Sequence, residues 1–515
     1  MRKNLKLFVM LALIAAMFGA CSKDKTDTTM ERIPADADVA IVLDLKKMVE
    51  SAGGKIDGDE VALPEYLTEI NDFDVKSYCS SGLKLDCVGG WADAESEACF
   101  EVFAVKDADR LKEFLAGKGY KPTMAAGGYE FYGRDGDYDD SLLPRCAVGD
   151  GWAYFIEHEA TDGEVAKIID SAASEPMSKT AQGQYASAGD AASLVMSSRI
   201  VRRLMPPLAP MMFSSATISM NFDIRKDEIV GHSAMFDSEG KRLSPDSFGF
   251  KFDSSATVST DALEYLAPSE ALVFAAALKD VDWDSVVNSV GAQAGMNATQ
   301  RIMLGMIKDY LKKIDGTVAV GIGFDGTMAD LENASGRGKT IDYLPLTIVV
   351  QTAPGVPKGL LGDLEAVLST FGVRASMSGD SFSAHLPGQG GMIYGKAEKR
   401  TLILSTRQIE SYDNNPAKKL LKGGIFGLSV CLPADYPLIR EIGVDDNLEF
   451  SAVADAKNAE STFCLKVSGP GDAGVLERLI KLAAQYEKAQ DVFEAERLWS
   501  PVRHRRGHHH RRHVH

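Results

Sequence analysis

Residues Pro34–Val49 read PADADVAIVLDLKKMV, and the chain returns to this pattern much later. In the first occurrence an apolar run, Val39–Leu45, leads into a helical pattern that begins at Lys46. The second occurrence, PSEALVFAAALK, starts at Pro268 and also leads into a helical pattern. A buried strand followed by a helix, written twice, predicts that one structural unit occurs twice in the chain.

The segments that follow each opening keep the same order. EVFAVKDADRLKEFLAGKGY (Glu101–Tyr120) predicts a strand, a helix and a glycine stop, and TIVVQTAPGVPKGLLGDLEAVLSTFGV (Thr347–Val373) predicts the same with a longer connection. Later, ATISMNFDI (Ala216–Ile224) and LEFSAVADA (Leu448–Ala456) both alternate apolar and polar residues. Alternation with period two is typical of half-buried strands. The repeated order favours a tandem duplication.

The sequence therefore predicts an α+β fold with two tandem homologous units, residues 32–255 and 256–499, each with an antiparallel sheet covered by helices. Short hairpins and period-two strands are typical of antiparallel sheets with one face in solvent. Helices with an apolar stripe, such as the one that carries Leu111, Phe114 and Leu115, are expected to cover the other face. A repeat of this length indicates duplicated domains rather than a solenoid.

Length and charge limit the classes of protein that fit. The chain has 515 residues, 45% of them hydrophobic, which is enough for more than one core. Its formal net charge is −17. Such a charge argues against nucleic acid as a partner, because binding there depends on lysine and arginine neutralising phosphates.

The first residues predict a secretory signal peptide at 1–20. A basic start precedes an apolar run, Leu7–Ala20, that is shorter than the roughly 20 residues a membrane-spanning helix needs. The letters FGAC, ending at Cys21, resemble a bacterial lipobox, which implies that Cys21 is lipidated. An ordinary cleaved signal followed by an incidental cysteine is the alternative.

Residues 21–31 then form the lipidated cysteine and a polar tether, so the membrane is a partner through the N-terminal lipid alone. By resemblance to lipoprotein sorting rules, Ser22 in place of aspartate implies the outer membrane. The periplasmic face and the cell surface stay open as alternatives. At the other end, residues 500–515 are a basic tail rich in histidine and arginine, for which we expect disorder.

The lipobox, the opening IPADADVAIVLDLKKMVESAG and its echo DALEYLAPSEALVFAAALKDV resemble a family of lipoproteins of Gram-negative gut anaerobes. That family carries a domain of unknown function over nearly the whole mature chain. The resemblance implies an outer-membrane anchor and two repeats. It supplies no catalytic residues to carry over to this sequence.

Two motifs suggest enzyme chemistry but lack the required surroundings. Gly321–Gly326 has the spelling of a dinucleotide-binding turn, yet no long helix is predicted after it, so a hairpin is favoured. Gly379–Ser381 is similar to an esterase nucleophile motif, and His385 lies four residues after Ser381 on the same predicted strand. The two side chains would share a face but lie far apart. We predict no catalytic residues and no enzyme activity.

Two surface segments are candidate binding sites. The first is an acidic loop, whose alternate carboxylates can hold calcium. Its sequence departs from the EF-hand pattern, and a solvated hairpin loop is the alternative. Apart from this calcium, no cofactor is expected. An apolar loop rich in methionine and proline forms either a contact surface or packing between the units. The acidic loop supplies Asp135, Asp137, Asp139 and Asp140, and the apolar loop supplies Met205, Met211, Met212 and Phe213.

Taken together, these features predict a lipid-anchored envelope protein that binds a protein or glycan partner or serves in assembly. The alternative is an envelope hydrolase with its site between the two units. The ligand, the membrane side, the oligomeric state and the pairing of the cysteines do not follow from the sequence.

Overall fold

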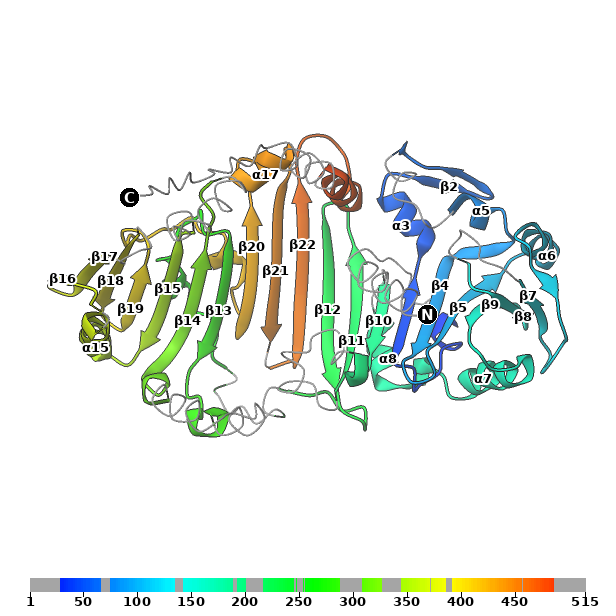
Figure 1. Cartoon of the computed structure of the whole chain (residues 1–515), viewed down its shortest axis with the longest axis horizontal. Helices are drawn as coiled ribbons and strands as arrows, with labels where there is room; N and C mark the ends of the chain where they lie inside the picture. Colours follow the sequence, from blue (N-terminus) through cyan, green and yellow to red (C-terminus); the bar gives the residue numbers. More distant parts are fainter. Residues whose placement is uncertain are drawn as a thin grey trace, which may run out of the picture.

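The chain folds into helices and one large antiparallel sheet, which makes it an α+β protein (Figure 1). The computed structural model describes residues 28–65, 75–134, 142–188, 192–200, 216–244, 247, 253, 255–287, 308–326, 344–370, 372–385, 391–455 and 457–485.

Ten strands of the first half pair in the order β6-β7-β8-β9-β5-β4-β1-β10-β11-β12. The predicted alternating strand at 216–224 is confirmed as β11. The bounds are β1 Val39–Leu43, β4 Leu83–Asp93, β5 Ala98–Val105, β6 Lys121–Pro122, β7 Glu130–Gly133, β8 Arg145–Gly149, β9 Trp152–Glu157, β10 Ala192–Met196, β11 Thr217–Ile224 and β12 Glu228–Phe236.

Ten strands of the second half pair in the order β16-β17-β18-β19-β15-β14-β13-β20-β21-β22. Each strand takes the place of its counterpart in the first half. The bounds are β13 Leu272–Leu278, β14 Ile314–Ile322, β15 Leu346–Thr352, β16 Ala375–Ser378, β17 Ser381–His385, β18 Met392–Glu398, β19 Thr401–Ser405, β20 Phe426–Leu432, β21 Asn447–Asp455 and β22 Glu460–Ser468.

The two halves share a single sheet, because β12 pairs with β22 in antiparallel register with Gly231 opposite Phe463. The expectation of a separate sheet in each unit is therefore wrong. An outermost strand leaves backbone N–H and C=O groups unpaired, and these two strands satisfy each other's groups. Figure 1 shows the result as one broad sheet with β16 at one end.

Helices lie on both faces of this sheet, and local sequence explains where several begin. Asp107 caps α6 by accepting hydrogen bonds from the backbone N–H groups of Asp109 and Arg110, and Thr161 with Glu164 forms a capping box on α7. Short helices also occupy residues 283–287 and 308–311, and a longer one occupies 475–485. The named helices are α3 Leu45–Ser51, α5 Val75–Cys79, α6 Ala108–Gly117, α7 Asp162–Ser174, η1 Met177–Lys179, α8 Ala181–Ala186, α11 Thr260–Leu263, α15 Val356–Thr370, α16 Ala417–Leu420 and α17 Pro437–Ile442.

The first half buries both faces of its strands. We name the faces of the whole sheet after the residues that they carry, the Phe100 face and the Phe274 face. On the Phe100 face, Trp91, Phe100 and Tyr154 pack beneath α7 and α8. On the Phe274 face, Phe103 packs in a second core beneath α3, α5 and α6. Here the expected solvent-facing side of the sheet does not exist.

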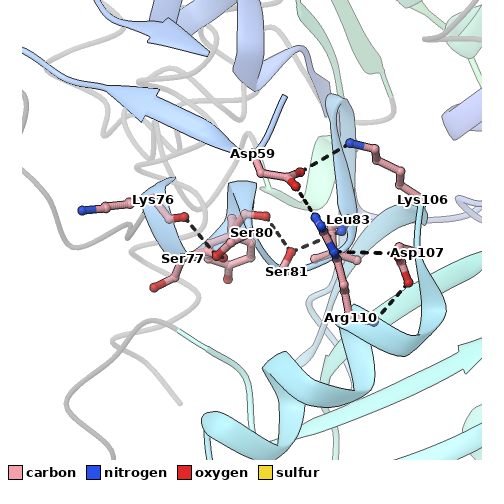
Figure 2. A network of polar contacts seen from close by, with 10 residues as sticks. Asp59, Lys76, Ser77, Ser80, Ser81, Leu83, Lys106, Asp107 and Arg110 are labelled. Atoms are coloured by element: carbon pink, nitrogen blue, oxygen red, sulfur yellow. Dashed lines mark hydrogen bonds and ion pairs between the residues drawn. The ribbon is translucent and has the colours of Figure 1, made fainter. Parts of the chain in front are cut away.

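A small hairpin, β2 Lys55–Asp57 and β3 Glu60–Ala62, completes the cover on the Phe274 face of the first half. Figure 2 shows how its turn is held: Asp59 receives hydrogen bonds from Lys106 and Arg110, which stand before and within α6. The hydrogen bond from Arg110 holds the pKa of Asp59 below its usual value. The hairpin and α6 are therefore tied to each other as well as to the core.

In the second half the cover is different. The Phe100 face carries a core beneath α11 and α16, built from small and aliphatic residues such as Val273, Ala319 and Val349. The Phe274 face is covered by α15 over β17–β19 and, near the junction of the halves, by the helix at 475–485. The strands that lie between these two covers carry the candidate site.

Candidate functional site

Two rows of apolar side chains cross the second half of the sheet on its Phe274 face. We call them the apolar rows. Each follows the strand register from β22 through β21, β20, β13, β14 and β15. The first row is Phe463, Ala452, Leu428, Phe274, Val320 and Ile348, and the second is Leu465, Phe450, Val430, Leu272, Ile322 and Leu346.

The centre of the apolar rows is exposed. Phe274 is 47% exposed and Leu272 is 37% exposed, although both lie in β13, in the middle of the second half of the sheet. No member of the two rows is polar or charged. Continuous apolar surfaces are typical of contact sites for other molecules, because leaving them in water is unfavourable.

The corresponding place in the first half is closed. Ile41 of β1 lies opposite Gly90, as Phe274 of β13 lies opposite Val320, but Ile41 is only 6% exposed. It packs in a core with Phe222 and with Val475, the first residue of the helix at 475–485. The same strand position is therefore core in one half and surface in the other.

A second feature of the second half is a buried polar network on the Phe100 face. Glu270 is 3% exposed and accepts hydrogen bonds from the Thr347 hydroxyl and, at 3.0 Å, from the Ala267 N–H. Thr347 in turn lies 3.0 Å from the hydroxyl of Ser405. Burial raises the pKa of Glu270, while the hydrogen bond from Thr347 opposes that shift.

Gly321 makes room for this carboxyl. A Cβ atom built on Gly321 would lie 2.4 Å from the Glu270 Oε2 atom, so any larger residue would displace the network. At the edge of the network, Arg407 donates a hydrogen bond to the Ser269 hydroxyl at 2.8 Å and pairs with Asp325. The oxygens of Glu270 and Ser405 are thus engaged with protein groups. This arrangement orders the core beneath α11 and α16.

Glu101 is, like Glu270, an acidic residue whose pKa is raised by burial. It lies on the Phe274 face of β5, opposite Gly90 on one side and Phe155 on the other. Burial raises its pKa to about 7. We did not predict this residue, yet the sequence CFEVF, with one carboxylate inside an apolar strand, carried the signal.

The site residues predicted from the sequence lie outside the described residues. This applies to Cys21, the acidic loop Asp135–Asp140 and the apolar loop Met205–Phe213, as well as to the tail 500–515. Within the part that the structure describes, no three His, Cys, Asp or Glu side chains gather in a way that could hold a metal ion. The same part contains no helix of the length and hydropathy needed to cross a membrane.

Parts of the two motifs that suggested enzymes lie within the described strands, and residues 327–343, where the predicted hairpin would continue, lie outside the described residues. Ser381 and His385 are the two ends of β17. Gly321 is inside β14, and residues 323–326 after it are not helical. The apolar rows could not have been predicted in this form, because their register depends on strands far apart in the chain.

Comparison with known proteins adds three weak structural neighbours. No protein-family model matches the chain, and no curated protein matches it. Among solved structures, crystal forms I, III and IV of TP0453 align at 12%, 11% and 11% identity with TM-scores of 0.27, 0.28 and 0.28. The alignments cover 44%, 42% and 40% of this chain and 86%, 82% and 79% of the other. At these scores the likeness supports no conclusion about fold or function.

Proposed function

We propose that the chain is a lipid-anchored protein of the outer membrane that binds a protein partner and has no catalytic activity. One observation carries the binding role: Phe274 and Leu272 are exposed at the centre of the apolar rows. Aliphatic and aromatic side chains are typical of the core of a protein interface. A glycan, with its dense hydroxyl groups, would leave many hydrogen bonds unmade on such a surface.

We further propose that the two halves arose as tandem homologous units. The strand orders support this proposal, since each half pairs its ten strands in the same sequence. In the first half α6 follows β5, and in the second half α15 follows β15, the strand that corresponds to β5. The duplication would have provided a second half of the sheet whose Phe274 face could change while the first half kept its cover.

A hydrolase site between the two halves has less support. Where β12 meets β22, the carboxylate of Glu460 lies 2.8 Å from the His232 ring and 3.7 Å from Arg242. In the described chain Glu460 contacts the His232 ring and the Arg242 guanidinium rather than a second carboxylate. A general acid and base pair of carboxylates is therefore not assembled at this junction.

Site-specific photo-crosslinking in intact cells tests the binding role. A photo-reactive amino acid is placed at Phe274 and, as the matched control, at Met124, an apolar side chain of the first half that is 75% exposed. We expect a discrete crosslinked protein of constant mass from position 274 and none from position 124. Equal yields from both positions, or no adduct from 274, would remove the proposed contact surface.

The anchor is tested separately. Cys21→Ser should release the protein from the membrane fraction, because the lipid is the only proposed attachment. Mass spectrometry of the mature N-terminus of the native protein should show the added mass of the lipid on Cys21. Protease treatment of intact and permeabilised cells then separates the cell surface from the periplasmic face.

A further inference from the structure

We propose that the open edge of β16 accepts an extended peptide segment of a partner protein as an additional strand. The inference goes beyond the apolar rows, which lie on a face of the sheet, and does not depend on them. It concerns the backbone groups along β16, the outermost strand of the second half, at one end of the sheet in Figure 1.

The edge is built from four residues, Ala375–Ser378, which pair with β17 on one side only. No other strand of the described chain pairs with β16. Ser376, Met377 and Ser378 are exposed, Met377 at 41%. Alternate backbone N–H and C=O groups of such a strand point away from the sheet and can bind a further strand.

The other end of the same sheet is protected. There the outermost strand is β6, which has only two residues, Lys121 and Pro122. Proline has no N–H to donate, and a lysine at an edge opposes pairing by its charge. Ala375–Ser378 contains neither proline nor a charged residue. The two ends of one sheet thus differ in the feature that prevents strand addition.

The chain also closes its inner edges by strand pairing. The last strands of the two halves, β12 and β22, are joined from Glu228 opposite Lys466 to Ser233 opposite Ser461. Each half of the sheet therefore has one edge strand that pairs with the other half and one edge strand, β6 or β16, that has no further neighbour in the described chain. Of the two free edges, only β16 lacks a protecting residue.

The length of the edge argues for a peptide rather than a second copy of the chain. A stable interface buries about 1,200 Å² or more, and four residues of strand pairing cannot supply that area. Strand addition by a short peptide needs no such area, since main-chain hydrogen bonds provide much of the affinity.

The side chains beside the edge define the chemistry of that peptide. Ala375 packs against the core beneath α15, and Met377 lies opposite Phe382 of that core. Ser376 and Ser378 point to the other face by alternation. We infer a proline-free segment with apolar side chains at alternate positions, toward Met377, and small polar ones between them.

A synthetic fluorescent peptide, DSFSAHL, provides the probe, because it copies residues 380–386, which include β17, the one strand that β16 already accepts. We expect it to bind the full chain and to slow hydrogen exchange at residues 375–378. Two peptides methylated on alternate backbone nitrogens are the controls. In the first control the methyl groups block the amides that face the sheet, so its affinity should fall about tenfold or more. In the second they lie on the other amides, and this peptide should bind with the affinity of the unmethylated peptide.

Protein variants complete the test. Met377→Lys copies the protection of the opposite edge and should weaken peptide binding about tenfold or more. Met124→Lys, which adds the same charge elsewhere, should leave it unchanged. Phe274→Glu should also leave it unchanged, which separates this proposal from the contact at the apolar rows.

Three results would overturn the inference. The first is equal binding of both methylated peptides, which would mean that main-chain hydrogen bonds to the edge do not matter. The second is undiminished binding to the Met377→Lys variant, or no binding to the full chain. The third is a dimer of the native chain, seen in sedimentation, that becomes a monomer in the Met377→Lys variant. Such a dimer would mean that the edge pairs with a second copy of the chain.

Discussion

The two halves of the sheet place different residues at the same position. In the first half Phe100 lies opposite Trp91 and opposite Ile156, the fifth residue of β9. In the second half Thr347 lies opposite Gly321 and opposite Ser405, the fifth residue of β19. The rings of Trp91 and Phe100 stack with centroids 4.4 Å apart, whereas the second half holds the Glu270 network there.

This difference extends to both faces. The first half puts its aromatic side chains into cores on both faces of the sheet. The second half has small and polar residues in the core beneath α11 and α16, and carries the apolar rows, with Phe274 and Leu272 exposed, on the opposite face. One strand order can thus support a half with cores on both faces and a half with an exposed apolar surface.

The largest expected effect comes from truncating the aromatic stack. Phe100→Ala removes a side chain that is 1% exposed and should lower the free energy of unfolding by about 3–5 kcal/mol. Thr347→Ala at the corresponding place removes one donor from Glu270 and should cost about 1–3 kcal/mol. Urea unfolding followed by circular dichroism measures both. Equal losses would contradict the contrast between an aromatic and a polar core.

A smaller effect depends on pH and on Glu101, whose counterpart in the second half is Ile348. The folded state raises the pKa of Glu101 to about 7, so it holds the proton more tightly than the unfolded chain does. Stability contributed by this group is therefore full below about pH 4.5 and is lost as the pH rises to about 7. The loss should be about 3 kcal/mol.

Glu101→Gln should remove that loss, because an amide does not titrate. The measurement is the free energy of unfolding of the native chain and of the variant at intervals from pH 4.5 to 8. The two curves should separate with rising pH, the variant being the more stable at pH 8. Parallel curves across this range would show that the carboxyl of Glu101 is solvated in the folded protein.

The smallest effect is expected at the exposed centre of the apolar rows. Phe274→Ser should change the free energy of unfolding by less than about 1 kcal/mol, since the ring is 47% exposed. The same variant should reduce binding of an apolar fluorescent dye to the native protein. A stability loss similar to that of Phe100→Ala would mean that Phe274 belongs to a core, and the comparison of the halves would fail.

The order of elements was predictable from local pattern. The helix expected within Glu101–Tyr120 is α6, Ala108–Gly117, and the strand expected over Leu448–Ala456 is β21, Asn447–Asp455. These predictions worked because amphipathic periodicity and glycine stops act within one element. The candidate site was not predictable in the same way: Leu272 reads as a core residue, since its strand is apolar throughout.

The amino-acid sequence is sufficient for the repeated order of strands and helices, because that order depends on side chains close together in the chain. Which apolar residues become surface was decided by tertiary structure, through the pairing of β12 with β22 and the places where α6, α15 and the helix at 475–485 cover the sheet. Burial depends on contacts between distant segments, so Ile41 and Phe274 end in opposite environments although β1 and β13 take the same place in the strand order of their halves.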